Sequence, residues 1–519
     1  MSLPRSPLRG WCSLFLSAAA LSAFAQNPPK NPPKKEDGWV YHQDEQAGVR
    51  VQTRELILHP RAAPRPALKH RLMLDEFERT PGNAALFYLK ATGFFEQESA
   101  RERISQHRKE QLKRVQKEGL EYGQLPPYVW LNTAPEDLPV EEVKKYLQWL
   151  SFQPQFIREG AKRSHFDMNR NFREVDDPIA YLLPEIQGFR ELARMQSLRC
   201  RLAIAEGRLD DAVEITGQQF AVAAHLGDDD FLVSNLVGIA IAHIAWNDAL
   251  YLVQHPQAPN LYWALAAMPS PLVSQRRAMA TERQFLYQQL KVLREVSERP
   301  RPAGYWQDFV DRLAPQLGYL GSELGLSPTE NNPEAVRAAI VAFVAAAYPG
   351  AKKYLLEEQK LPPGQVEAYP TAQVVFLAMV RFHDHWRDEM FKWMHLPYWQ
   401  ARTKMTSQNL SKNLRVEAQR CGWCAMPTQT LLPAVLAART AEARSVQVLA
   451  LLQTVEAVRM YAAEHGGGLP PSLEALSVPA PIEPLTGQPI QYELLREQAV
   501  LTGHAMPGLR YRLVLKIAQ

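Results

Sequence analysis

The stretch RMYAAEHGGGLPPSLEAL (residues 459–476) decides the fold of the last part of the chain. Apolar residues recur at helical spacing through 445–465, so that Val448, Leu452 and Val455 lie on one face of a helix. Three glycines then end this helix and two prolines redirect the chain. The pattern predicts a long amphipathic helix followed by a different kind of structure.

The residues after the two prolines read as a small antiparallel sheet. In LRYRLVLKI (509–517) apolar side chains recur at every second position from Tyr511 to Ile517, which is the period of a half-buried strand. The segments PIEPLTGQPIQYELL (481–495) and QAVLTG (498–503) come before it. We therefore predict an α+β tail over 439–519, made of a long helix and a small sheet.

This tail resembles the soluble part of a type II secretion pseudopilin or pilin-like domain. The residues that carry the resemblance are Tyr461, His465-Gly466, Leu469-Pro470, Pro484, Thr486-Gly487, Pro489 and Tyr492. Pilins carry an N-terminal hydrophobic assembly helix, whereas the corresponding helix here is internal and amphipathic. The resemblance therefore implies a reused packing unit and gives no support for filament assembly.

The region before the tail, 46–430, is expected to be an irregular array of helices. Its apolar segments have helical periodicity and are separated by prolines, at which helices tend to end. Taken whole, the chain is predicted to be mainly α, an α-α helical array with a small C-terminal α+β domain. It resembles uncharacterised exported bacterial proteins that join such parts, a family that implies no activity.

Within this array, residues 198–230 predict a hairpin of two helices. Gly207 suits the left-handed turn between two helices, and Asp210 suits the N-cap of the second. The run AEGRLDDA (205–212) resembles the turn between the helices of a tetratricopeptide repeat, with its glycine, large apolar residue and alanine. A third helix is expected over 231–246, with a mostly apolar body.

The first 25 residues read as a secretory signal peptide. Arg5 and Arg9 precede the apolar run 11–25, which ends in small residues suited to cleavage. Residues 26–45 follow as a Pro- and Lys-rich linker. We therefore expect an exported protein, periplasmic or extracellular.

The charge balance argues against a nucleic-acid partner. The net charge is +4, and loss of Arg5 and Arg9 leaves 57 basic against 55 acidic residues, or +2. This value gives no electrostatic argument for nucleic acid. The longest later apolar run, 338–348, suits a buried helix, so no transmembrane span is expected in the mature chain.

The sharpest local motif is CGWC at 421–424. Two cysteines at this spacing can form a redox disulfide, if a helix N-terminus favours the thiolate. The alternatives are a structural disulfide at the junction before the tail, or unpaired thiols. A zinc site would need two further ligands, and the sequence has no second CxxC.

A second segment, RFHDHWRDEMFKWMH (381–395), raises a metal hypothesis that helix geometry opposes. Residues two apart on a helix point in nearly opposite directions, so His383 and His385 do not chelate one ion. His385 and Glu389 are four apart and supply only two ligands. We predict no metal and no cofactor.

Aromatic residues gather at the end of this segment. Trp393, Tyr398 and Trp399 could line a binding surface, or could fill gaps between helices. The sequence lacks the serine-hydrolase elbow, the P-loop, the dinucleotide-binding glycine motif and HExxH. We therefore favour a non-enzymatic envelope protein that acts through protein–protein contacts, as a scaffold or in secretion. The alternative is an exported thiol–disulfide enzyme that uses Cys421 and Cys424.

Overall fold

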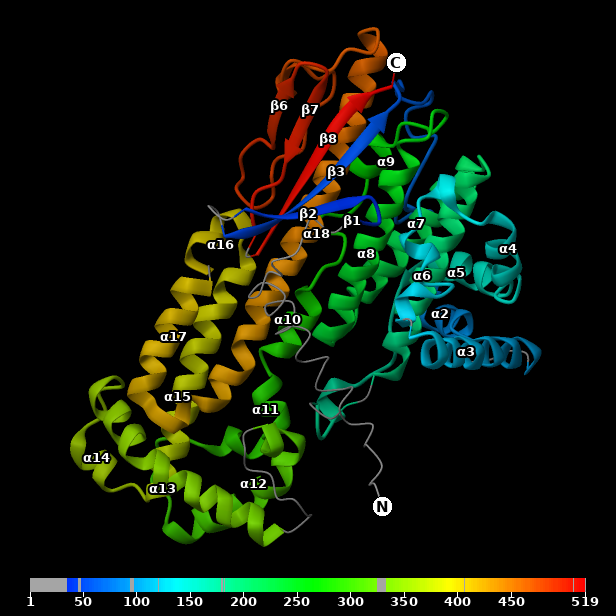
Figure 1. The fold of residues 1–519 in the computed structure, drawn as a ribbon. Helices are drawn as coiled ribbons and strands as arrows, with labels where there is room; N and C mark the ends of the chain where they lie inside the picture. Colours follow the sequence, from blue (N-terminus) through cyan, green and yellow to red (C-terminus); the bar gives the residue numbers. More distant parts are fainter. Residues whose placement is uncertain are drawn as a thin grey trace. The chain divides into compact units, whose positions relative to one another are not determined.

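The computed structural model describes residues 35–44, 48–93, 98–119, 121–178, 181, 183–323, 333–405, 407–506 and 508–518 (Figure 1). The predicted signal peptide and residues 26–34 and 45 of the predicted linker lie outside these ranges. The chain forms two compact units. Unit 1 comprises 1–168, 184–275 and 440–519, and unit 2 comprises 169–183 and 276–439. Helices dominate both units and a small sheet includes the C-terminus, which confirms the predicted fold class.

Unit 1 contains a six-stranded sheet, a two-stranded sheet and a group of helices. Its strands are β1 (Lys35–Glu36), β2 (Trp39–Asp44), β3 (Val49–Leu58), β4 (Thr80–Asn83), β5 (Arg163–His165), β6 (Gln491–Leu495), β7 (Gln498–Thr502) and β8 (Leu509–Ile517). Its helices are α2 (Ala85–Ala91), α3 (Glu98–Glu118), α4 (Val140–Gln148), α5 (Gln153–Ala161), α6 (Pro184–Ala205), α7 (Leu209–Leu226), α8 (Leu232–Leu252), α9 (Tyr262–Ala266) and the part of α18 (Met426–Glu464) from residue 440 onward.

The six-stranded sheet joins residues 35–58 to residues 491–517. Its order is β1-β2-β3-β8-β7-β6, and β3 runs parallel to β8 from Arg50 opposite Leu509 to Leu58 opposite Ile517 (Figure 1). The alternation expected in 509–517 is present, because Tyr511 and its alternate neighbours are buried. The sheet is therefore not the purely antiparallel, C-terminal unit that the sequence predicted. Residues 35–58, assigned to the linker and the helical array, cover the edge that β8 would otherwise expose.

One face of this sheet packs on α8 through aromatic rings. Trp39 of β2 lies 5.3 Å from Trp246 of α8 and 5.8 Å from Tyr511 of β8, measured between ring centroids. Trp246 and Tyr511 are 5.2 Å apart in an edge-to-face arrangement. Such pairs stabilise a core beyond the area that they bury. The C-terminal strands therefore belong to the same core as the helices of unit 1.

The hairpin expected around Gly207 is present as α6 and α7. Gly207 has φ +71°, a left-handed conformation that glycine adopts without strain. Helix α7 begins at Leu209, so Asp210 lies within its first turn and is not the N-cap. The third helix of the segment is α8, which begins at Leu232 and is longer than the sequence indicated.

Residues 459–476 end the long helix at the glycines, as their sequence predicts. Helix α18 ends at Glu464, and Gly466 and Gly467 both have positive φ. The amide of Gly467 donates to the carbonyl of Ala462 at 2.8 Å and so satisfies the helix end. The phenol of Tyr492 on β6 then donates to the carbonyl of Pro470 at 2.6 Å. This bond holds the redirected chain against the sheet.

Unit 2 is a succession of helices. They are α10 (Arg276–Glu282), α11 (Phe285–Gln289), α12 (Ala303–Glu323), α13 (Pro333–Glu357), α14 (Pro363–Glu367), α15 (Thr371–Phe391), α16 (Tyr398–Met405), α17 (Ser407–Cys421) and residues 426–439 of α18, with short 3₁₀ turns η7 (Lys392–His395) and η8 (Gly422–Ala425). The core between α12 and α15 is aromatic: Phe309 and Phe376 are both buried, with ring centroids 4.9 Å apart.

Helix α13 is longer and more exposed than the run 338–348 suggests. Ile340, Val344 and Ala347 form a buried stripe, whereas Val341 is 55% exposed. One stretch, Glu334–Glu357, is long and apolar enough to cross a membrane by length and composition, and 22% of its most apolar window is buried. The prediction of a buried helix is therefore wrong for most of this surface. Length and apolar composition alone do not identify a membrane span, because core helices of soluble proteins can have both. The absence of a transmembrane span therefore stays a prediction.

Candidate functional site

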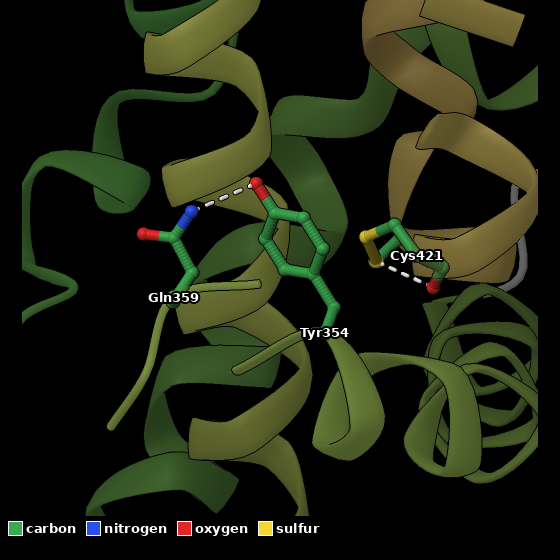
Figure 2. Close-up of a disulfide and its surroundings, with 4 residues drawn as sticks. Tyr354, Gln359 and Cys421 are labelled. Atoms are coloured by element: carbon green, nitrogen blue, oxygen red, sulfur yellow. Dashed lines mark hydrogen bonds between the residues drawn. A yellow bond between two sulfur atoms is a disulfide. The ribbon is translucent and has the colours of Figure 1, made fainter. Parts of the chain in front are cut away.

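The CGWC segment forms a disulfide at the turn from α17 to α18. Cys421 is the last residue of α17, Cys424 lies in η8, and their sulfurs are bonded (Figure 2). The Sγ atom of Cys424 also lies 2.8 Å from the carbonyl oxygen of Cys421. Gly422 has φ +70°, which lets the chain reverse inside this short loop.

Helix α13 packs closely against this turn. A Cβ atom added at Gly350 would lie 2.7 Å from the carbonyl oxygen of Cys421, so only glycine fits there without a shift. One helical turn later, Tyr354 is buried with its ring 5.7 Å from that of Phe382 on α15. The Nε2 of Gln359 donates to the Tyr354 hydroxyl at 3.0 Å (Figure 2). The disulfide therefore lies in the packed junction of unit 2.

This environment favours a structural crosslink over a redox centre. Both cysteines are fully buried, whereas thiol–disulfide exchange requires an attacking thiolate to reach one sulfur. Cys421 ends α17, where the negative end of the helix dipole disfavours a thiolate, whereas Cys424 comes just before α18, whose positive end favours one. Burial is therefore the stronger argument against exchange. Whether the pair has a redox role stays a prediction, and the geometry gives that role little support.

The two histidines of the 381–395 segment have separate surroundings. His383 is buried, with Nδ1 3.3 Å from the Thr428 hydroxyl, and burial lowers the pKa of His383 to about 3. His385 is exposed, and its ring lies 4.0 Å from the carboxylate of Glu417. Within the described ranges, no group of three or more His, Cys, Asp or Glu residues could hold a metal ion.

The aromatic residues Trp393, Tyr398 and Trp399 lie on η7 and at the start of α16. Trp393 and Tyr398 are half-buried, while Trp399 is 45% exposed. Between them, Leu396 is also exposed, and its carbonyl accepts a hydrogen bond from Arg439 at 2.9 Å. The backbone is therefore held while part of the aromatic surface faces solvent. Two of the three rings are therefore half-buried and the third is exposed. Both interpretations of these residues stay predictions.

Positive charge is concentrated on the same segment, which the sequence reasoning missed. Residues 392–420 contain six Lys or Arg and one acidic residue, Glu417, giving +5 in a chain of net charge +4. Lys404, Lys412 and Arg415 are exposed, and none of them pairs with a carboxylate among the described residues. The net charge of each segment, counted separately, would have shown this excess of positive charge, which the net charge of the whole chain does not reveal.

On α17 the exposed side chains form one stripe. Lys412, Arg415 and Val416 are exposed at positions that share a helix face, and Val416 is 43% exposed. Leu410 and Leu414 occupy the opposite, buried side. Trp423 follows α17 and is 59% exposed. We call residues 392–423, with their exposed basic and aromatic side chains, the basic–aromatic segment.

Unit 1 contains a buried charge network that the sequence did not indicate. Arg201 of α6 is 2% exposed and donates from both Nη atoms to Asp37, at 2.8 and 2.9 Å. Its Nε lies 3.3 Å from Asp248 of α8. Burial opposes the charge of Arg201, but Asp248 and Asp37 outweigh that effect, so the pKa of Arg201 is raised.

The same network reaches β3 through Arg54. Arg54 is also 2% exposed and donates to Asn247 Oδ1, with its guanidinium 4.0 Å above the ring of Tyr251. Asp37 additionally accepts hydrogen bonds from Tyr251, at 2.8 Å, and from Asn247. Asp37, Asp248, Arg54 and Arg201 therefore balance two buried cations with two carboxylates. These contacts tie the first strands to α6 and α8, which is a structural role.

Comparison with known proteins adds no relative. No protein-family model, no curated protein and no solved structure matches the chain.

Proposed function

We propose that this protein is an exported envelope protein that acts through protein–protein contacts, and that the basic–aromatic segment is its contact surface. The observation that carries this proposal is the exposure of Trp399, Leu396, Val416 and Trp423 within one segment of the chain. The same segment carries Lys404, Lys412 and Arg415, which are exposed and have no carboxylate partner among the described residues. Singly exposed apolar side chains are common on protein surfaces, whereas Trp and Tyr together with Arg are typical of the centres of binding surfaces.

The charge of the segment indicates the kind of partner. Lys404, Lys412 and Arg415 carry no neutralising carboxylate among the described residues, so an acidic surface would gain their full attraction. Electrostatic complementarity of this kind raises the association rate and weakens as salt increases. We therefore expect an acidic protein partner whose binding falls between low and high salt.

Site-specific photocrosslinking tests the proposal in the cell that exports the protein. A photoreactive phenylalanine replaces Trp399 or Val416, and a control replaces Leu68 of unit 1, which is comparably exposed at 53%. We expect the same protein adduct at positions 399 and 416 and no such adduct at 68. The double variant Lys412→Glu/Arg415→Glu should abolish the adducts at 399 and 416.

The outcomes separate the alternatives. Adducts that appear at position 68 alone would place the contact surface on unit 1 and overturn the assignment of the segment. No adduct at any position would count against a protein-contact function and return attention to the thiol–disulfide alternative. That alternative predicts a changed phenotype when Cys421 and Cys424 are both replaced by serine.

A further inference from the structure

Unit 1 has a cavity of about 230 Å³ beside the hairpin of α6 and α7, bordered also by α5. Its volume is below the roughly 300–1,000 Å³ that is typical of sites for drug-sized ligands, so an occupant would be small. Pro154, Leu202 and Ile215 supply apolar walls. The amides of Gln196 and Gln218 also line it, and Gln196 Nε2 donates to Gln218 Oε1 at 3.0 Å.

The charges of the lining are not balanced. Three arginines and two carboxylates line the cavity. Two of the arginines are partly exposed and pair with carboxylates: Arg158 with Glu214 at 2.6 Å, and Arg208 with Asp211 and also with Glu206, which lies outside the lining, at 2.6 Å. The remaining cation is Arg199, and it is the most buried of the three, with 9% of its surface exposed.

Arg199 has only neutral partners among the described residues. Its Nη1 donates to Gln196 Oε1 at 2.9 Å, and its Nη2 donates to the carbonyl of Leu150 at 2.9 Å and to Gln153 Oε1 at 3.0 Å. Burial lowers the pKa of Arg199 to about 10, which leaves it charged at neutral pH. A buried cation without a carboxylate is costly, and the part of the chain that the structure describes supplies no carboxylate to Arg199.

We propose that this cavity binds a small monocarboxylate, whose carboxylate pairs with the guanidinium of Arg199 and whose short hydrocarbon part lies against Pro154, Leu202 and Ile215. Nη2 already donates both of its N–H groups, so the carboxylate would accept from Nε or from the remaining N–H of Nη1. Such a charge-assisted bond is stronger than those that Arg199 now makes with neutral acceptors. A single carboxylate also neutralises the one excess cation of the lining. This site is independent of the basic–aromatic segment.

Calorimetric titration of the full exported chain at pH 7.5 tests the proposal with hexanoate as the probe. Hexanamide has the same hydrocarbon chain without the charge, and inorganic phosphate has the charge without the chain. We expect hexanoate to bind at least tenfold more tightly than either. Equal binding of hexanoate and hexanamide would overturn the role of Arg199, and tighter binding of phosphate would overturn the assignment to a monocarboxylate.

Three variants locate the binding. Arg199→Gln should weaken hexanoate binding at least tenfold. Ile215→Phe keeps Arg199 and narrows the cavity, so it should also weaken hexanoate binding. This variant tests the proposal even if Arg199→Gln does not fold. The matched control Glu55→Gln/Lys516→Gln removes an exposed ion pair of the unit 1 sheet, outside the cavity lining, without changing the net charge, and should change the affinity less than threefold. Wild-type affinity in Ile215→Phe would overturn the proposal.

Discussion

Unit 1 brings together residues 35–58, 184–275 and 440–518, whereas unit 2 is built almost entirely from the continuous stretch 276–439. Unit 1 connects its distant segments through buried arginines, of which Arg201, 2% exposed, pairs with the partly exposed Asp37 across 164 residues of sequence. Every ion pair described in unit 2 has at least 14% of each side chain exposed, and its buried link is a disulfide between residues three apart.

This difference has a physical reason. Closing a long loop costs conformational entropy, and long-range segments need specific contacts that fix which strand lies next to which. Buried charges supply such specificity, because a wrong register would leave each of them without a partner. Neighbouring helices need no such device, since their connections already place them side by side. Each unit should therefore respond to a different class of substitution.

The largest effect is expected from Asp37→Asn in unit 1. Asparagine tolerates the positive φ of 50° at this position, so the backbone is retained. Among the described residues, the substitution leaves Arg54 and Arg201 with Asp248 as their one carboxylate, and breaking a buried pair costs about 3–5 kcal/mol. Urea unfolding should show this loss, and hydrogen–deuterium exchange should place it in residues 35–58 and α8.

The matched control is Asp211→Asn, which breaks an exposed pair with Arg208 in the same unit. Exposed pairs contribute about 0–1 kcal/mol, so its unfolding curve should nearly overlay that of the wild type. Faster exchange in α13 to α17 of the Asp37→Asn protein, without change in the first strands, would contradict the assigned role of the network.

A second test uses pH, because each unit contains a buried neutral histidine. Burial lowers the pKa of His383 in unit 2 to about 3 and that of His225 in unit 1 to about 4. Since both folded-state values lie below the ordinary value near 6.5, the stability contributed is complete above pH 6.5. It is lost as pH falls, because the unfolded chain binds the proton first.

At pH 5 each histidine should cost about 2 kcal/mol of unfolding free energy relative to pH 7.5. His383→Gln should remove its share of that loss from unit 2, and His225→Gln should do the same for unit 1, where the Tyr88 hydroxyl lies 2.7 Å from the His225 ring. Denaturant unfolding at the two pH values measures both. A variant that keeps the full wild-type pH dependence would show that its histidine titrates normally.

The third test concerns the disulfide of unit 2. Only two residues separate Cys421 and Cys424, so the crosslink closes a very short loop and should contribute about 2 kcal/mol. Cys421→Ala/Cys424→Ala should lose that amount, with faster amide exchange in α13 and α17 and no change in unit 1. Because both sulfurs are buried, the native disulfide should also resist dithiothreitol that reduces it readily in urea. Rapid reduction of the native protein would instead support the thiol–disulfide alternative.

The comparison of the units also explains which features the sequence could predict. The helices of unit 2 and the hairpin at Gly207 follow from local periodicity and turn chemistry, which act within a few residues. Strand β8 was recognised because Tyr511, Leu513 and Leu515 alternate with less buried residues. Strand β3 was not, because one of its buried positions is Arg54, which interrupts the apolar pattern.

The candidate site residues were likewise predictable only where the signal was local in sequence. CGWC and the aromatic residues could be selected from residue type alone. The burial of Cys421 depends on the approach of Gly350 of α13, which the sequence does not place. The buried charge network joins residues more than 150 positions apart, and no local signal marks Asp37 or Asp248 as partners of Arg201. Long-range pairing is therefore what sequence reasoning lacked.

The smallest effect on stability is expected from Trp399→Ser in unit 2. Trp399 is 45% exposed, and surface substitutions away from packed features usually change stability by less than about 0.5 kcal/mol. The same substitution at Trp306, which is buried and donates to Gln373 at 3.3 Å, should cost about 3–5 kcal/mol. Thermal unfolding of the two variants therefore distinguishes the exposed ring of Trp399 from the core ring of Trp306 in the same unit. A loss of 2 kcal/mol or more at position 399 would make its ring part of the framework and remove it from the proposed contact surface.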